Sequence, residues 1–202
     1  MRVIWLRHGI TQANMEKRYI GHLDVPLTET GREQVRTFAA KLSKSVPWNG
    51  WDCIATSDSI RCRQTAELLG QRFAAATIPT QALRELNFGK WEGMTYAEIQ
   101  QGDAGRYKEW IRHPFTLAPP GGETLYALGQ RVDAFLNDQL NQWTEAADRT
   151  IGVVTHGGPL RWFLSKWIEG DPAQFWHVRG IPHGQGISTR WDGRHWSVTD
   201  WI

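Results

Sequence analysis

The sequence predicts an α/β protein: a three-layer α/β/α fold around a mostly parallel central sheet, with a small inserted helical lobe. Two observations carry this prediction. Short apolar runs typical of buried strands alternate along the chain with segments of helical periodicity. Hydrophobic residues make up 41% of the 202 residues and charged residues 22%, which is typical of a globular protein. We therefore expect a single domain over residues 1–202, with the lobe at residues 95–120.

The first half of the chain contains two predicted strands, each followed by a predicted helix. Residues 2–6 and 51–56 are short apolar runs and are interpreted as buried strands. The first helix is predicted from apolar residues at helical spacing, namely Val35, Phe38, Ala39 and Leu42. Thr28 or Thr30 is its expected N-cap, and Glu33 would complete a capping box with Thr30.

The second half contains the lobe, two more helices, a third strand and a hairpin. Residues 95–120 are rich in aromatic side chains and are expected to form one or two helices. An apolar stripe from Leu125 to Leu140 predicts a long amphipathic helix, and residues 159–168 predict a shorter one. Residues 151–154 are the third apolar run. Alternating residues around Asp192-Gly193 predict a hairpin that adds an antiparallel edge to the sheet.

Charge and composition exclude several classes of partner. The net charge is +2 and Lys and Arg form no long run, so we expect neither a nucleic-acid nor a membrane partner. No apolar run approaches the ~18 residues of a membrane span, and the start of the chain lacks a signal-peptide pattern. Cys53 and Cys62 form no CxxC pair and are expected to be packing residues in a reducing compartment. We predict a cytoplasmic protein; its oligomeric state stays open.

Cationic side chains follow each of the three predicted buried strands. Arg7 and His8 follow the first strand, Arg61 follows the second, and His156 follows the third. Because ligands of open α/β sheets bind outside the carboxyl ends of the strands, these four residues are expected to meet in one cleft. An arginine fork matches phosphate oxygens, and a neutral imidazole can attack phosphorus. The sequence therefore predicts a phosphate site with a histidine nucleophile.

A general acid is expected in the irregular stretch of residues 83–93. It contains Glu85 and Glu92, and either carboxyl group could reach over the cleft. The remaining histidines lack the spacing of metal ligands, so no metal and no cofactor are expected; they are His22, His113, His177, His183 and His195. The His183-Gly184 pair is interpreted as a surface loop, with contact to the substrate from that loop as the alternative.

Several blocks of sequence, in order along nearly the whole chain, resemble the histidine phosphatase superfamily, the phosphoglycerate-mutase-like proteins. The blocks are Arg7-His8-Gly9 with Thr11 and Asn14, Gly21 to Gly31, Ser57 to Ala66, Leu83 to Gly93, Gly121 to Thr124, and Thr155 to Gly158. The short chain and the block FGKWEG are most similar to the small phosphatases of this family, among them α-ribazole-5′-phosphate phosphatases.

The resemblance implies a role for each principal residue. His8 would be the phosphorylated nucleophile, and Glu85 would donate a proton to the leaving group. Arg7, Arg61 and a protonated His156 would hold the phosphoryl oxygens and stabilise charge during transfer.

Further residues are implied at the edge of the phosphate site. Asn14 would contact the phosphoryl group, the backbone N–H of Gly157 would add a donor, and Gly21 would belong to the phosphate-binding region. Two positions depart from the family pattern: Ile10 stands where Glu is frequent, and Ile20 where Ser or Thr is frequent. These departures bear on substrate identity more than on the type of reaction.

The sequence thus predicts a metal-independent phosphomonoesterase that acts through phosphohistidine on a small phosphorylated metabolite. Two alternatives stay open: a phosphoglycerate-type mutase and a non-catalytic phospholigand-binding module. Only about thirty residues separate Glu92 from Gly121, where the resembling mutases carry a longer insertion. His8 and Glu85 argue against the binding module, because binding needs neither a nucleophile nor an acid. The aromatic residues of the lobe favour a ring-bearing leaving group, as in α-ribazole 5′-phosphate.

Overall fold

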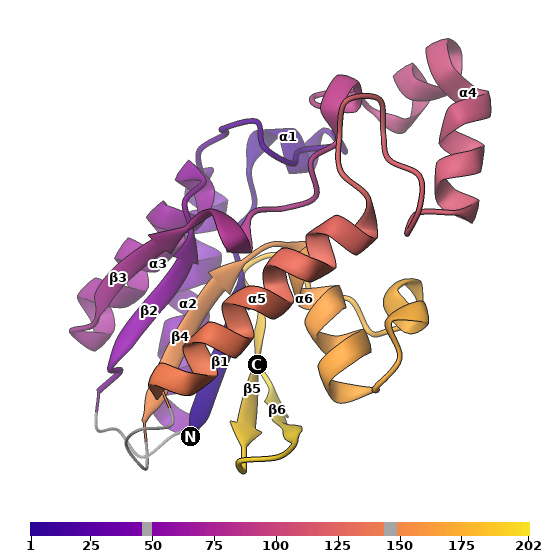
Figure 1. Cartoon of the computed structure of the whole chain (residues 1–202). Helices are drawn as coiled ribbons and strands as arrows, with labels where there is room; N and C mark the ends of the chain where they lie inside the picture. The colour runs from indigo at the N-terminus through magenta and orange to yellow at the C-terminus, as the bar shows by residue number, and fades with distance from the viewer. Residues whose placement is uncertain (46–49, 144–148) are drawn as a thin grey trace.

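The computed structural model describes residues 1–45, 50–143 and 149–202. Six strands form one sheet in the order β3-β2-β4-β1-β5-β6 (Figure 1). Strands β1, β2, β3 and β4 run parallel, whereas β5 and β6 form the antiparallel edge that the hairpin signal predicted. The strands are β1 (Arg2–Arg7), β2 (Cys53–Ser57), β3 (Ala76–Thr80), β4 (Thr150–Thr155), β5 (Gly186–Trp191) and β6 (Trp196–Trp201).

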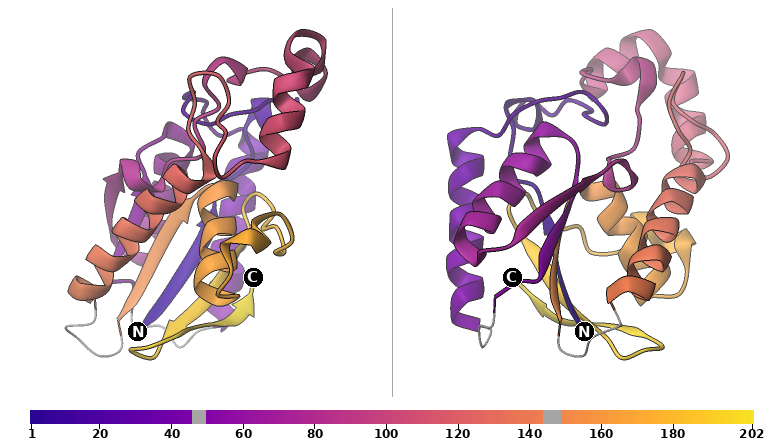
Figure 2. Two further views of the ribbon diagram at one scale, coloured as in Figure 1. Left: turned by 45° about the vertical axis from the view of Figure 1, so that its right-hand side comes forward. Right: turned by 60° about the vertical axis from the view of Figure 1, so that its left-hand side comes forward.

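Helices cover both faces of the sheet, as the three-layer prediction requires (Figure 2). The α-helices are α1 (Gln12–Met15), α2 (Glu29–Ser45), α3 (Ile60–Phe73), α4 (Tyr96–Arg112), α5 (Leu125–Trp143) and α6 (Gly157–Trp162). Helix α6 continues as a π-helical segment, η3 (Phe163–Ile168), and three short 3₁₀ turns are η1 (Gln81–Leu83), η2 (Gly89–Trp91) and η4 (Pro172–Trp176).

Alternation along β1 explains the two cores. Ile4 and Leu6 point to the face covered by α2 and α3, where they pack with apolar side chains of both helices. Val3 and Trp5 point to the opposite face, where they belong to the cluster built on α5 and α6. Each of these four side chains is at most 1% exposed, and burying one is worth about 1.5–3 kcal/mol.

The structure differs from the sequence prediction at three elements. Strand β3 was not predicted, because it lies at the sheet edge with mostly exposed side chains and contains Pro79. Thr28, not Thr30, caps α2: its Oγ1 accepts the Gly31 N–H at 3.0 Å, whereas Thr30 lies inside the helix. The helix predicted over residues 159–168 begins at Gly157 and changes to π-helix at Phe163.

The lobe lies beyond the carboxyl ends of the parallel strands (Figure 1). A capping box between Thr95 and Glu98 starts α4, and the helix is kinked at Asp103. Its Trp110 is 2% exposed and packs edge-on to Trp91, so part of the predicted aromatic cluster is the core of the lobe.

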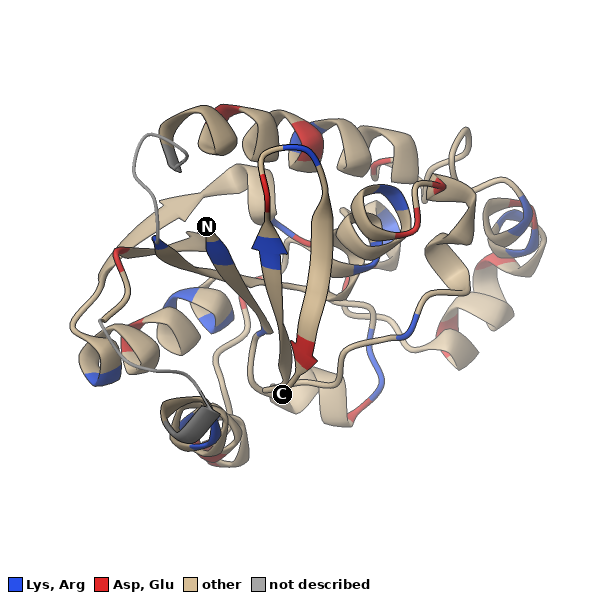
Figure 3. Ribbon diagram, turned by 90° about the horizontal axis from the view of Figure 1, so that it is seen from below, with Lys and Arg blue, Asp and Glu red and all other residues tan. Residues whose placement is uncertain are grey.

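Residues of both charge signs are scattered over the helices and loops, without a large patch of one sign in this view (Figure 3). Of the helices that the structure describes, none is long and apolar enough to cross a membrane.

Candidate active site

The two His-Gly turns meet at the centre of the sheet edge. Arg7 and Thr155 are paired in the register of β1 and β4, so His8 and His156 leave adjacent strands side by side. Their ring centroids are 5.0 Å apart at an angle of 66°. Both side chains are buried, with at most 3% exposed. The predicted juxtaposition of the two histidines is therefore present.

The orientation of His8 suits a nucleophile. Its Nδ1 lies 2.7 Å from the carbonyl oxygen of Gly9. Because a carbonyl oxygen only accepts, Nδ1 carries the proton and Nε2 keeps its lone pair in the neutral ring. Burial, followed by the charge of Arg61, lowers the pKa of His8 well below its usual value. The imidazole is consequently neutral and ready to attack through Nε2.

The structure corrects the expected charge of His156. Its Nδ1 lies 3.2 Å from Nη2 of Arg61 and must accept, so Nε2 carries the proton and donates to Ser57 Oγ at 2.9 Å. Burial and the charge of Arg61 lower the pKa of His156 well below its usual value, so the ring is neutral. The Cys62 thiol, 3.3 Å from Nε2, stays neutral because burial raises its pKa to about 12.

Arg7 and Arg61 bring two guanidinium groups to this edge. Arg61 is fully buried and donates to the carbonyl oxygens of Gly21 at 2.7 Å and Leu23 at 2.9 Å. Arg7 donates to the carbonyl oxygen of Ile181 at 3.0 Å. Within the described part of the chain, Nε of each arginine is buried without a hydrogen-bond partner. Two guanidinium groups beside two histidines, each anchored by backbone carbonyl oxygens, form a cationic site that fits the oxygens of a phosphate.

Glu85 reaches the same edge from the segment between η1 and η2. Its carboxylate accepts the Gly158 N–H at 3.0 and 3.1 Å and the Leu86 N–H at 2.8 Å. A Cβ at position 158 would overlap this carboxylate, which explains the second glycine of the Thr155–Gly158 block. In the described residues Glu85 forms no ion pair within 4.0 Å, although Arg7 lines the same cavity. Its carboxyl group therefore lies at the cavity wall, held by backbone N–H groups and not by an ion pair.

Two residues that the sequence analysis left without a role hold the Glu85 segment. Arg131, on α5, donates to the carbonyl oxygens of Ala82 at 2.8 Å and Glu85 at 2.9 Å. Glu123 pairs with Arg131 at 2.7 Å and also accepts the Asn87 N–H at 3.0 Å. The Gly121–Thr124 block thus holds the backbone around Glu85 in place, through the partially buried ion pair of Glu123 with Arg131.

Glu92, the second acid candidate, has a structural role. Its two carboxylate oxygens accept four backbone N–H groups at 2.9–3.2 Å, from Gly21, His22, Leu23 and Phe88. Each carboxylate oxygen of Glu92 thereby accepts two hydrogen bonds. Glu92 fastens the loop of residues 21–23, whose carbonyl oxygens in turn hold Arg61.

We expect Glu92→Gln to lower the stability of the fold by about 1–3 kcal/mol, because a glutamine NH₂ would face two backbone donors that it cannot accept. Thermal unfolding of the variant against wild type measures the loss. The leaving-group dependence of its turnover should match that of wild type. A selective slowing of esters with poor leaving groups would instead assign the acid role to Glu92.

The three remaining predicted contacts lie around this centre. Gly21 donates its N–H to Glu92 and its carbonyl accepts from Arg61, and a Cβ there would overlap the Leu86 carbonyl. Gly157 lies at the start of α6, where an added Cβ would be 3.4 Å from Arg7. Asn14 Oδ1 accepts from the backbone N–H and the hydroxyl of Thr11, and it completes the capping box in which Thr11 is the N-cap of α1. Phosphoryl contacts from these residues stay predictions.

His183 is not on a plain surface loop, and that interpretation is wrong. Its ring centroid is 4.9 Å from that of His8, and its Nδ1 lies 3.3 Å from the His8 carbonyl oxygen. The Gly184 N–H also bonds the carbonyl oxygens of Arg7 and His8 at 3.1 Å. Burial, with the charge of Arg7, lowers the pKa of His183 to about 3. The sequence did contain a signal for this contact: His183-Gly184 is the third His-Gly pair of the chain, and it contacts the first pair, His8-Gly9.

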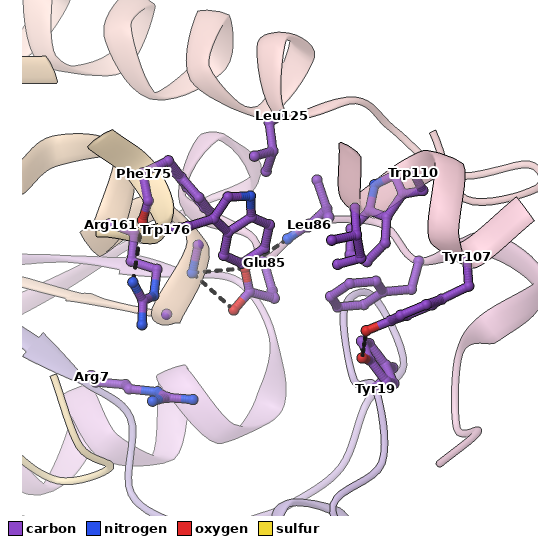
Figure 4. Close-up of a pocket in the computed structure, with 14 residues that line it drawn as sticks. Arg7, Tyr19, Glu85, Leu86, Tyr107, Trp110, Leu125, Arg161, Phe175 and Trp176 are labelled. Atoms are coloured by element: carbon purple, nitrogen blue, oxygen red, sulfur yellow. Dashed lines mark hydrogen bonds between the residues drawn. The ribbon is translucent and has the colours of Figure 1, made fainter. Parts of the chain in front are cut away.

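A cavity of about 330 Å³ opens beside this centre, between the sheet edge and the lobe (Figure 4). Arg7, Glu85 and Gly157 line its inner end. Aromatic side chains from the lobe, from η4 and from the segments beside α1 and η2 form much of the wall, namely Tyr19, Phe88, Tyr107, Trp110, Phe175 and Trp176. A carboxylate and a guanidinium group therefore line the same pocket as these aromatic side chains.

Comparison with known proteins agrees with this geometry. Residues 3–202 match the sequence profile of the histidine phosphatase superfamily (branch 1). The chain belongs to this superfamily. This histidine phosphatase is 34% identical over 183 residues to an adenosylcobalamin/alpha-ribazole phosphatase of Escherichia coli, covering 89% of this chain and 85% of that protein. It is 33% identical to a glucosyl-3-phosphoglycerate phosphatase of Mycolicibacterium vanbaalenii, with 89% and 79% covered.

Solved structures give the same result. The alpha-ribazole phosphatase from Shigella flexneri superposes with a TM-score of 0.88 at 27% identity, covering all of this chain and 96% of that chain. A mycobacterial glucosyl-3-phosphoglycerate phosphatase has been solved in complex with inorganic phosphate, with a TM-score of 0.82, 27% identity and coverage of 99% and 96%. This histidine phosphatase is accordingly a phosphomonoester hydrolase acting on a small phosphorylated metabolite.

Proposed function

We propose that this histidine phosphatase hydrolyses its substrate in two steps through phosphohistidine at His8. In the first step, Nε2 of His8 forms a bond to phosphorus while the bond between phosphorus and the alcohol oxygen breaks. The carboxyl proton of Glu85 goes to the departing oxygen. In the second step, water attacks phosphorus, Glu85 takes a proton from it, and the N–P bond breaks to release inorganic phosphate.

The observation that carries this proposal is the hydrogen bond from His8 Nδ1 to the Gly9 carbonyl at 2.7 Å. It leaves Nε2 as the free lone pair of a neutral, buried ring, which is the form that attacks phosphorus. Arg7 and Arg61 supply the positive charge for the phosphoryl oxygens, and neutral His156 adds a hydrogen-bonding partner. Positive charge that is already in position before the reaction lowers the barrier to phosphoryl transfer more than any other single factor.

The leaving alcohol occupies the aromatic cavity in this proposal. Tyr19 and Tyr107, whose hydroxyl oxygens are 2.7 Å apart, present polar edges within an otherwise apolar wall. A ring-bearing alcohol suits such a wall, so α-ribazole 5′-phosphate is one candidate substrate. Glucosyl-3-phosphoglycerate, which also carries a ring, is the second. The cytoplasmic location, the single domain of residues 1–202 and the 95–120 lobe as its inserted unit stay predictions.

A turnover assay with and without a metal chelator tests the mechanism. We expect 4-nitrophenyl phosphate hydrolysis to persist in excess EDTA and to gain nothing from added Mg²⁺ or Zn²⁺, because Arg7 and Arg61 provide the positive charge. A rate that is lost in EDTA and restored by metal would contradict the proposal.

The same preparation distinguishes hydrolysis from isomerisation. With 3-phosphoglycerate we expect release of inorganic phosphate and no 2-phosphoglycerate, because water must reach the phosphohistidine. Accumulation of the isomer without phosphate release would restore the mutase alternative.

A further inference from the structure

A third guanidinium group lines the cavity, on the side away from the lobe. Arg161 follows the Thr155–Gly158 block on α6, and its side chain points into the cavity that Arg7 and Glu85 also line (Figure 4). Its Nη1 donates to the carbonyl oxygens of Phe175 at 3.2 Å and Val178 at 3.1 Å. Two carbonyl groups therefore hold the guanidinium in place before any ligand binds.

This guanidinium forms no direct ion pair in the described part of the chain. Among the described residues, no carboxylate lies within the 4.0 Å of an ion pair with Arg161, and neither Nε nor Nη2 has a hydrogen-bond partner. Burial lowers the pKa of Arg161, and the nearby Glu85 carboxylate opposes that effect. Arg161 is half-buried, and its Nε and Nη2 donors are open to an anionic group of a ligand.

The position of Arg161 separates it from the phosphoryl centre. Arg61 and His156 contact each other at the sheet edge, whereas Arg161 lines the same cavity as the aromatic wall that takes the leaving alcohol. Arg7 lies between the two regions, since it adjoins the phosphoryl centre and also lines the cavity. An anion at Arg161 therefore belongs to the alcohol part of the substrate.

We propose that Arg161 binds a carboxylate carried by the leaving alcohol, so that the substrate class is a phosphomonoester of a hydroxy acid. The free Nε and Nη2 donors match the two oxygens of a carboxylate. The aromatic wall then takes any ring attached to that acid. This inference rests on the proposed function, because it places the phosphoryl group at His8.

A matched pair of substrates tests the subsite. 3-Phosphoglycerate and glycerol 3-phosphate differ by a carboxylate in place of a hydroxymethyl group, and 4-nitrophenyl phosphate reports the chemistry alone. We expect wild type to hydrolyse 3-phosphoglycerate with a kcat/KM at least about tenfold above that for glycerol 3-phosphate, because a charge-assisted pair is worth that much or more.

The variant Arg161→Met should lower this selectivity ratio by about 10- to 100-fold, mainly through the KM for 3-phosphoglycerate. Arg161→Lys should restore part of the ratio, since it keeps the charge without the planar fork. The matched control is Arg179→Met: Arg179 is exposed, lies on the neighbouring segment and stacks over Trp201 instead of lining the cavity. The control should keep the wild-type ratio.

The outcomes separate the two proposals. If wild type hydrolyses 4-nitrophenyl phosphate but shows no preference for 3-phosphoglycerate, the carboxylate subsite is wrong and the proposed function stands. Equal losses on both matched substrates in Arg161→Met, with a lowered melting temperature, would also overturn the subsite and make Arg161 a structural residue. If wild type hydrolyses none of the three esters, the proposed function itself fails.

Discussion

Replacing His8 with alanine will abolish turnover, with a loss on the order of 10⁴-fold or more. The reason is that His8 forms the covalent intermediate, which replaces one very slow displacement by two faster ones. Uncatalysed monoester hydrolysis is among the slowest reactions known. Wild type quenched during turnover of a ³²P-labelled ester should carry phosphate that is labile in acid and stable in base, as expected for phosphohistidine. The His8→Ala protein should carry none.

A second histidine variant shows whether the loss is specific to position 8 or follows from any His→Ala change. His113 is exposed on the lobe, so His113→Ala should keep wild-type turnover and labelling. The melting temperature of His8→Ala shows whether the fold survives, and retained binding of inorganic phosphate shows whether Arg7 and Arg61 are still in place. Wild-type-like turnover in a folded His8→Ala protein would exclude the phosphohistidine mechanism.

Replacing Glu85 with glutamine will slow esters according to the basicity of the leaving group. A general acid matters most when the departing alkoxide is a strong base, so an alkyl phosphate should lose about 10²–10⁴-fold and 4-nitrophenyl phosphate clearly less. Glutamine can still accept the Gly158 N–H through its oxygen, so the local structure should be kept. The measurement is kcat/KM over a series of phosphomonoesters of graded leaving-group pKa.

The control for this series is Glu67→Gln, an exposed position on α3 where the same change should alter neither the rate nor its leaving-group dependence. An equal loss for all esters in Glu85→Gln would mean that Glu85 holds the substrate or the Gly158 turn and does not donate the proton.

Much of the centre was predictable from local patterns. The apolar runs before Arg7 and His156 identified two buried strands, and the rule that parallel strands end at one sheet edge predicted that His8 and His156 meet. The same rule placed Arg61, although it reaches the centre from α3 and through the loop that contains Gly21. The antiparallel edge followed from the hairpin signal at Asp192-Gly193. Strand β3 was not predicted, because an exposed edge strand lacks the apolar pattern that marks a buried one.

The sequence by itself determined which residue types stand at the ends of the strands, since periodicity and turn residues are local properties of the chain. Periodicity and turn residues left two nearby carboxyl groups as acid candidates, and only the tertiary structure shows how differently the two are held. Glu85 meets Gly158 and stays unpaired, whereas Glu92 is used up by four backbone donors. It also decided that His156 is neutral and that Arg161 lines the leaving-group cavity. The physical reason is common to all three: burial, hydrogen-bond partners and neighbouring charges come from segments remote in the chain, and they exist only once the fold has brought those segments together.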